Sequence, residues 1–505
     1  MIIGRREALT LATGFAAASA LGNCGEAQSA SFGDGRTDAT DKLLDIFAEM
    51  AVTGRSIPIA GVYKISRPIA IPPGIVVGDN VTFDFRGADP ANFPGACLLV
   101  HGAVKRPLPG LLESLKIGDR RVAFKAAHKM TMGEAFQLSG TVDFAGNGYR
   151  PYYRKGEIFR VARVIDARTV EIEGACRDSY PASGVTCWHR PGSSFSQKCK
   201  TLRVLAPDNI QFAARFIGLD RSDISNVQAE GGSVAAIDIL DCFEMAGKNL
   251  QARQRSNRFD GYGISIDACQ SIRLSGMAHG YFNGIATGGG GKGTDGLIGM
   301  NRDIHFEGTA SSDAKGGLAG ANFHGNTEFS SYRGLFTNGV VLAGNHNEAH
   351  GEFIGKSGQS ALIFSEMHGH SFLVTGRVRT TGADLPSNAG AINMGSSGDD
   401  YGRHARYGGR AIIDVSVDAP QASRIVLWRT TDLKRKDVAL EFRRLELVRS
   451  HPKARFMVLS KVRGDALPLI QFGKWQVDDK AVPIKWSIDP GTQLQGLDRR
   501  RLTAA

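Results

Sequence analysis

Short apolar segments recur through the second half of the chain, and each begins with a small residue followed by aliphatic ones. Successive starting points lie 21, 33, 22 and 22 residues apart. The segments are Gly263–Asp267, Gly284–Ala286, Gly317–Ala319, Gly339–Leu342 and Ala361–Phe364. Repeats of this length bury their apolar faces only against neighbouring repeats. The pattern therefore predicts a β-solenoid, with one longer loop at the glycine-rich residues 288–293.

A different period appears near the start of the chain, over residues 42–50. Its apolar positions fall on one face of a helix, with Thr37 or Thr40 available as the N-cap. These positions are Leu43, Leu44, Phe47 and Met50. A short helix with one apolar face needs a surface to cover, and in a solenoid that surface is the open first coil.

The solenoid period is lost between about residues 97 and 198. Within this stretch, residues 157–165 and 168–173 alternate between apolar and polar positions, as the two strands of an antiparallel hairpin do. We therefore divide the chain into a capping helix with first coils at 31–96, a small β insertion at 97–198, main coils at 199–450 and C-terminal strands with a tail at 451–505.

Composition supports a β-rich chain with polyanionic partners. The 505 residues include 63 Gly and only 18 Pro, and the formal net charge is +11. Excess glycine with many short apolar runs favours a many-turned β architecture. The positive charge favours binding to acidic polymers, but aromatic and basic residues are not interleaved as they are in nucleic-acid-binding proteins.

The N-terminal 30 residues have the pattern of a signal peptide. Arg5-Arg6 precedes the apolar stretch Leu11–Leu21, which is too short to span a membrane. The twin arginines predict export to the periplasm or outside the cell. In an exported protein, disulfides among Cys176, Cys187 and Cys199 are permitted, although the spacing fixes no pairing.

The residues that follow carry a family resemblance. Gly33-Asp-Gly-Arg-Thr-Asp-Ala-Thr40 resembles the opening of the pectate-lyase superfamily, whose members often begin with Gly-Asp-Gly-x-Thr-Asp-Asp-Thr and a capping helix; here Ala39 replaces the second Asp. The resemblance implies an all-β, right-handed parallel β-helix. It leaves the reaction open, because the superfamily includes lyases, hydrolases, epimerases and phage tailspikes. It also leaves a homotrimer open, since tailspikes form trimers.

Three histidines at equal intervals indicate where the chemistry lies. His324, His346 and His368 are each 22 residues apart, and each is followed two positions later by a polar residue. These residues are Asn326, Glu348 and His370. In a solenoid, equal offsets become columns about 4.8 Å apart, so a 22-residue coil predicts a polar patch on one outer face. A 21-residue coil shifts the columns by one position.

The patch favours cleavage of an acidic polysaccharide by β-elimination. This reaction needs a base, a group that neutralises the uronate carboxylate, and an acid for the leaving oxygen. We assign His324 or His346 as the base, Tyr332 as the acid, and Arg333 with Asn326 as the neutralising pair. The remaining residues expected to contact the sugar are His350, Glu352, His368 and His370.

Three alternatives remain open. A hydrolase would use paired carboxylates from Glu328, Glu348 and Glu352, with Asp303 and Glu307 one coil earlier. A non-catalytic glycan-binding protein of the same fold would use the polar ladder only for contacts. Histidines two positions apart, as in His346-x-Glu348-x-His350 and His368-x-His370, could also hold a divalent cation, although no metal site or cofactor is certain.

Overall fold

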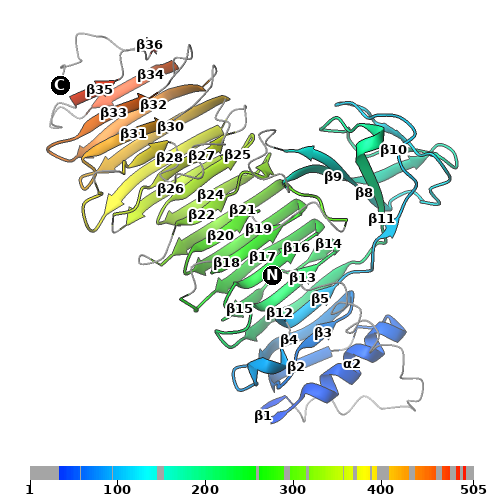
Figure 1. Ribbon diagram of the computed structural model, residues 1–505. Coiled ribbons are helices and arrows are strands. Elements are labelled where there is room, and N and C mark those ends of the chain that lie inside the picture. Colours follow the sequence, from blue (N-terminus) through cyan, green and yellow to red (C-terminus); the bar gives the residue numbers. More distant parts are fainter. Residues whose placement is uncertain are drawn as a thin grey trace. The chain divides into compact units, whose positions relative to one another are not determined.

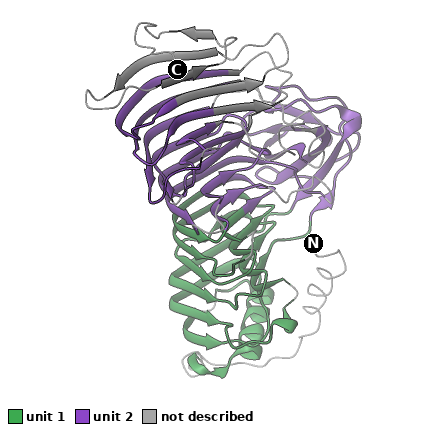
Figure 2. Cartoon of the chain, turned by 60° about the vertical axis from the view of Figure 1, so that its left-hand side comes forward, with its two compact units in different colours: residues 1–104, 191–265, 272–281 green, residues 105–190, 266–271, 282–505 purple. Residues whose placement is uncertain are grey.

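The computed structural model describes residues 33–56, 58–93, 95–144, 153–257, 261–288, 296–313, 318–356, 358–367, 372–386, 389–394, 409–431, 438–461, 469–477, 485–488 and 493–495. The predicted signal peptide, His368 and His370 lie outside these residues. The chain divides into two compact units, which are coloured separately in Figure 2. Unit 1 comprises residues 1–104, 191–265 and 272–281, and unit 2 comprises residues 105–190, 266–271 and 282–505.

In unit 1 the predicted capping helix, α2 (Thr40–Thr53), follows the first strand. Leu43, Phe47 and Met50 are buried, as their spacing predicts. The predicted cap is wrong, because the N-cap residue is Ala39 and Thr40 is already in the helix. The Thr40 hydroxyl instead donates to Asp38 Oδ1 at 2.5 Å. None of the helices in the described parts of the chain is long and apolar enough to cross a membrane.

The rest of unit 1 is built from two parallel sheets, whose strands alternate along the chain. One sheet contains β1 (Asp34–Asp38), β2 (Pro58–Lys64), β4 (Gly74–Asp84), β12 (Phe195–Leu205), β14 (Asp220–Asp223), β15 (Val227–Glu230) and β17 (Phe243–Arg253). The other contains β3 (Ile69–Ile71), β5 (Ala96–His101), β13 (Phe212–Ile217) and β16 (Ala235–Leu240). A short 3₁₀ helix, η1 (Pro90–Asn92), precedes β5. This alternation is that of a parallel β-helix, as predicted.

Unit 2 contains the predicted insertion, a six-stranded antiparallel sheet. In spatial order its strands are β6 (Arg106–Pro107), β11 (Val185–Arg190), β8 (Ala135–Asp143), β9 (Arg154–Val164), β10 (Thr169–Ile172) and β7 (Arg121–Ala123), and η2 (Ala182–Gly184) precedes β11. The predicted hairpin is confirmed by β9 and β10. The predicted limits 97–198 are too wide, because β5 and β12 are parallel strands of the coils.

The coils of unit 2 again alternate between two parallel sheets (Figure 1). The first sheet contains β21 (Asn301–Ser312), β23 (Thr327–Glu328), β24 (Ser331–Thr337), β26 (Glu348–Lys356), β28 (Phe372–Thr381), β30 (Gly409–Ala419), β32 (Val438–Ser450), β34 (Leu469–Val477) and β36 (Gln493–Gln495). The second contains β20 (Asn283–Thr287), β22 (Ala319–Phe323), β25 (Val340–Gly344), β27 (Leu362–Met367), β29 (Ile392–Met394), β31 (Arg424–Thr431), β33 (Arg455–Lys461) and β35 (Lys485–Ile488).

Two features of these coils bear on the predicted domains and repeats. Paired strands continue to β36, so the coils extend beyond the predicted limit at residue 450. Four of the repeated apolar segments lie in strands, namely β18 (Tyr262–Asp267), β20, β25 and β27. Of the segment Gly317–Ala319, only Ala319 lies in β22, and Gly317 lies outside the described residues. Strands β18 and β19 (Gln270–Gly280) each contribute residues to both units.

The register of the coils differs from the predicted one. From β21 to β24 the step is 26 residues, because His305 pairs with Ser331, and from β24 to β26 it is 17, because Ser331 pairs with Glu348. From β22 to β25 the step is 19, and of these four steps only the one from β25 to β27 equals 22. The histidine ladder is therefore wrong: a 17-residue step places His346 beside Phe329, and not beside His324.

The interior of unit 2 is lined by aromatic rings. Tyr332 is fully buried and stacks on Phe323, with 3.8 Å between ring centroids and 5° between planes. Phe306 and Phe336 lie beside the same ring. Because alternate residues of a strand face opposite sides, residues 331 and 333 must point away from this core. The six cysteines from Cys97 to Cys269 are all buried free thiols, so none of the permitted disulfides forms.

A column of glycines crosses the first sheet of unit 2. Gly308, Gly334, Gly351 and Gly376 lie in register on β21, β24, β26 and β28, with φ between +132° and +150°. A Cβ on Gly351 would lie 2.0 Å from the Gly334 carbonyl oxygen, so a side chain cannot be placed there without moving the backbone. On β30 the next position is Val415, where the column ends.

Candidate functional site

A network of histidine, carboxylate and hydroxyl groups covers the outer side of β21, β24, β26 and β28. We call this surface the histidine face, and it comprises Asp303, His305, Ser331, Arg333, Glu348, His350 and Thr375. Its positions alternate with the buried residues Phe306, Tyr332, Ala349 and Val374. The alternation fixes which side chains point outward, and the strand register fixes which of them are neighbours.

The first part of the histidine face links three side chains in series. His305 Nε2 lies 2.8 Å from Asp303 Oδ1, and His305 Nδ1 lies 2.6 Å from Ser331 Oγ. Asp303 adopts a left-handed conformation, with φ +60°, at the corner where β21 begins its outward run. Its second oxygen accepts a hydrogen bond from Ser271 Oγ at 3.0 Å. The carboxylate is thus held from two sides while it orients the imidazole.

The second part repeats the same order of groups two strands away. His350 Nε2 lies 2.9 Å from Glu348 Oε2, and His350 Nδ1 lies 2.8 Å from Thr375 Oγ1. Arg333 is exposed and pairs in register with His350, so the two residues are lateral neighbours on β24 and β26. Since adjacent strands are about 4.8 Å apart, one sugar unit can contact both side chains.

An aromatic stack marks the corner next to the histidine face. The rings of Phe329 and His346 are parallel, with 4.7 Å between centroids and 10° between planes. The guanidinium carbon of Arg177, from the insertion, lies 5.4 Å from the centre of the Phe329 ring. Both stacked residues have left-handed backbones, at φ +51° and +52°. The turn that holds His346 is therefore fixed by ring packing.

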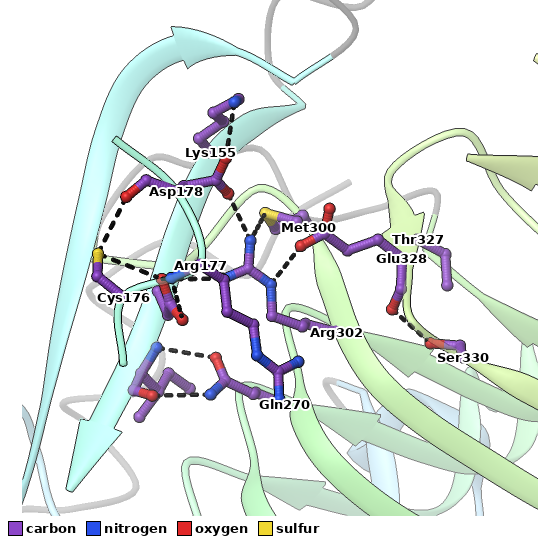
Figure 3. A network of polar contacts seen from close by, with 12 residues as sticks. Lys155, Cys176, Arg177, Asp178, Gln270, Met300, Arg302, Thr327, Glu328 and Ser330 are labelled. Carbon is purple, nitrogen blue, oxygen red and sulfur yellow. Dashed lines mark hydrogen bonds and ion pairs between the residues drawn. The ribbon is translucent and has the colours of Figure 1, made fainter. Parts of the chain in front are cut away.

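Behind this corner, a buried arginine connects the insertion with the coils of unit 2 (Figure 3). Arg302 is fully buried and contacts Glu157 at 3.0 Å, Asp178 at 2.5 Å and Glu328. Lys155 also binds Asp178, at 2.7 Å. Burial raises the pKa of Glu328, whereas for Asp178 the nearby Arg302 and Lys155 outweigh the desolvation and lower the pKa. The network anchors the insertion beside the histidine face.

Several predicted site residues lie elsewhere. Tyr332 is in the core, and its hydroxyl donates to the Asn322 carbonyl oxygen at 3.2 Å. Burial raises the pKa of Tyr332, so the prediction that it stands on the outer face as an acid is wrong. Asn326 and Glu328 are buried as well. They cannot contact a sugar on this face without rearrangement.

Of the other predicted site residues, the strand register brings some to the histidine face and places the rest elsewhere. Arg333, Glu348 and His350 do lie together on the histidine face, and His346 lies at its corner. His324 directly follows β22, and its Nε2 lies 3.3 Å from Asn322 Nδ2. Glu352 is engaged by Arg379 at 2.7 Å.

The prediction omitted His305, Ser331 and Thr375. One signal could have found the histidine, because an acidic residue precedes both His305 and His350 by two positions. The two hydroxyl partners come from the next strand, and their offsets of 26 and 25 residues cannot be read from the sequence. Within the described residues, no group of three or more His, Cys, Asp or Glu side chains is arranged to hold a metal ion.

Comparisons with known proteins agree with this fold. Residues 230–396 match the family model described as Gp49, pectin lyase-like. The structure is similar to that of the tailspike protein gp49 from Pseudomonas phage LKA1, with a TM-score of 0.71 and 18% identity, covering 87% of this chain and 77% of that one. A comparison with curated proteins gives no significant match.

Two further tailspikes share the architecture. The tailspike gp61 of Pseudomonas phage phi297 has a TM-score of 0.68 at 18% identity, covering 90% of this chain and 82% of that one. The Gp54 tailspike of Acinetobacter baumannii bacteriophage AP22, solved in complex with a capsular saccharide, has a TM-score of 0.67 at 19% identity, covering 90% and 75%. The chain thus has the pectate-lyase-like parallel β-helix fold that its opening residues predict.

Proposed function

We propose that the histidine face binds an acidic polysaccharide and cleaves it by β-elimination. In this proposal His350 is the base and Arg333 neutralises the uronate carboxylate. The observation that carries it is their register, which places the arginine directly beside a histidine held by Glu348 and Thr375. The capsular saccharide bound by the AP22 tailspike supports a glycan as the ligand, and the net charge of +11 supports an acidic one.

The contacts of His350 suit a base. With Nε2–H donated to the Glu348 carboxylate, Nδ1 is the unprotonated nitrogen, and in the free protein it accepts from the Thr375 hydroxyl. When Nδ1 takes the proton next to the uronate carboxylate, Glu348 stabilises the positive imidazolium. The same nitrogen then returns the proton to the leaving glycosidic oxygen. This cycle replaces the acid that Tyr332, as a core residue, does not provide.

The hydrolase alternative has less support from the geometry. It requires two carboxyl groups that flank the scissile bond. Of the predicted carboxylates, Glu328 is buried on Arg302, Glu352 pairs with Arg379, Glu348 orients His350 and Asp303 orients His305. Glu307 is exposed and lies in register with Arg333. A glycan-binding protein without catalysis would use the same face, so activity measurements must separate the three functions.

The test is incubation of the full chain with unacetylated uronate polymers, such as polygalacturonate, alginate and hyaluronan. β-elimination creates an unsaturated uronate that absorbs in the ultraviolet. We expect His350→Ala and Arg333→Ala each to reduce this rate by about 100-fold or more. His101→Ala on β5 and Arg443→Ala on β32 are matched controls that should retain the rate. New reducing ends without ultraviolet absorbance would instead show hydrolysis, and retention on glycan gels without cleavage would show a binding protein.

A further inference from the structure

The series Asp303, His305 and Ser331 has the order of groups that activates a serine nucleophile. We propose that it is a second catalytic site, which removes small O-acyl groups such as acetyl esters from a glycan lying on the histidine face. This reaction is separate from β-elimination and needs no uronate. It would use the first part of the histidine face together with Arg333, which the proposed elimination also uses beside His350.

The hydrogen bonds determine which nitrogen of His305 can act as the base. Nε2 is 2.8 Å from the Asp303 carboxylate, so the proton of the neutral ring lies there, and Nδ1 is free to accept from Ser331 Oγ at 2.6 Å. Asp303 is itself fixed by Ser271, at 3.0 Å. A nucleophile, a base within hydrogen-bond distance and a third group that orients the base together form the arrangement required for covalent catalysis.

The surroundings of Ser331 define the class of substrate. Ser331 is 6% exposed and its hydroxyl lies 2.6 Å from His305 Nδ1, while the side chain of His305 is 33% exposed. A hydroxyl with so little exposed surface favours a small acyl group over a bulky acyl chain. The sheet face is open along its strands and suits a polymeric alcohol as the leaving group.

Stabilisation of the oxyanion must come from side chains, because the backbone N–H groups of β24 are engaged in the parallel ladder. Arg333 lies two residues after Ser331 on the same strand and points to the same side. Its guanidinium is permanently charged and can donate to a developing oxyanion. The site therefore contains the four groups needed for ester hydrolysis.

The reaction balances as an ordinary two-step hydrolysis. Ser331 Oγ attacks the ester carbonyl while its proton passes to His305 Nδ1, and the sugar oxygen leaves with that proton. Water then gives a proton to the same nitrogen and attacks the acyl-serine. The carboxylic acid leaves, and the proton returns from His305 Nδ1 to Ser331 Oγ. The equivalent hydroxyl in the second series is Thr375, a more crowded secondary alcohol, which is why we assign the nucleophile to Ser331.

The experiment uses the full chain with p-nitrophenyl acetate and with an acetylated glucomannan, which contains no uronate and cannot undergo β-elimination. We expect release of nitrophenolate and acetate, with losses of about 100-fold or more in Ser331→Ala, His305→Gln and Asp303→Asn. Thr309→Ala, at a half-buried position of the same strand β21, is the matched control and should retain the rate. Thermal melting confirms that each variant is folded.

A second readout does not depend on turnover of a chosen substrate. A fluorophosphonate reagent should attach to Ser331, detected by peptide mass spectrometry, and His305→Gln should prevent attachment. Esterase activity that persists in Ser331→Ala, attachment at another residue, or no product from either ester with no attachment would overturn the proposal. Elimination is assayed on unacetylated uronate polymers, so failure of one activity is distinguishable from failure of the other.

Discussion

Two parts of one sheet in unit 2 bind their outward carboxylates in different ways. On the histidine face, Asp303 and Glu348 are hydrogen-bonded to histidines. Further along, on β28, β30 and β32, the partners are arginines, and we call this region the arginine ladder. Its residues are Arg377, Arg379, Asp414, Asp418, Arg444 and Arg449.

Whether a carboxylate is paired with histidine or with arginine determines whether the pair can take part in proton transfer or can only stabilise the sheet. An arginine stays charged at every accessible pH, so its pair with a carboxylate can hold strands together but cannot exchange a proton. In the arginine ladder, the hydrogen bond from Arg449 lowers the pKa of Asp418. A histidine near neutral pH can be charged or neutral, and a carboxylate beside it selects the tautomer. The same backbone thus supports a reactive surface in one region and a fixed ionic surface in the next.

The glycine column coincides with the histidine face and shares only β28 with the arginine ladder. It runs across β21, β24, β26 and β28, the four strands that carry the histidine face, and ends at Val415 on β30, where the arginine ladder continues. The close approach of successive backbones at these glycines shapes the sheet directly beside Arg333 and His350.

The largest expected loss of unfolding free energy comes from Arg302, which, like the arginines of the ladder, binds carboxylates but is fully buried. Arg302→Ala leaves Glu157, Asp178 and Glu328 buried without their shared cation, which should reduce the free energy of unfolding by about 3–5 kcal/mol. Arg443→Ala removes an arginine from the surface of β32 and should cost less than about 0.5 kcal/mol. Urea unfolding measures both. Equal losses of unfolding free energy in Arg302→Ala and Arg443→Ala would show that burial does not make an arginine–carboxylate contact more important for stability.

Gly351→Ala should have the next largest effect. The new Cβ would meet the Gly334 carbonyl oxygen at 2.0 Å, and φ is +135°, so we expect a loss of about 2–3 kcal/mol in the free energy of unfolding. The matched control is Gly192→Ala, whose Cβ meets no atom within 4 Å. Thermal or urea unfolding decides the outcome. A neutral Gly351→Ala would show that the column does not constrain the histidine face.

Asp418→Asn tests the arginine ladder through pH. The carboxylate binds Arg449 at 2.7 Å and Arg377 at 3.1 Å, and its loss should cost about 2 kcal/mol of unfolding free energy near neutral pH. Because the folded pKa of Asp418 is lowered, this contribution is present above the unfolded value of about 3.9 and is lost as pH falls through the folded pKa.

The measurement compares urea unfolding of the original and Asp418→Asn proteins at about pH 7 and about pH 3. The difference between the two proteins should shrink at the lower pH. Asp384→Asn, at an exposed position, is the control and should show no difference at either pH. A difference that is the same at both pH values would contradict the assignment of the ladder as an ionic contact.

The smallest effect is expected at the corner of the histidine face. Phe329→Ala removes the ring between His346 and Arg177 and should cost about 1 kcal/mol of unfolding free energy, since the ring is 38% exposed. A double-mutant cycle with His346→Ala measures the stacking itself, with an expected coupling of about 0.5–1.5 kcal/mol. Additive losses would mean that the stack does not fix the turn.

The sequence alone predicted much of this architecture. Apolar residues in short repeated runs have few ways to be buried, so the strands β18, β20, β25 and β27, the helix α2 and the β9–β10 hairpin could be predicted directly from the sequence. The alternation of buried and outward residues also placed Glu348 and His350 on one surface. Local patterns determine these features, because they depend on spacing within a single element.

The tertiary structure decided which residues of different coils meet. Steps of 26, 17 and 25 residues between successive strands brought Ser331 to His305 and Thr375 to His350, and moved His346 from a histidine column to the ring of Phe329. In the folded chain, the side chain of Tyr332 also points into the core. Turn length varies from coil to coil and leaves no periodic trace, so the sequence determined the parallel β-helix and its polar surface, and only folding determined which side chains share a site.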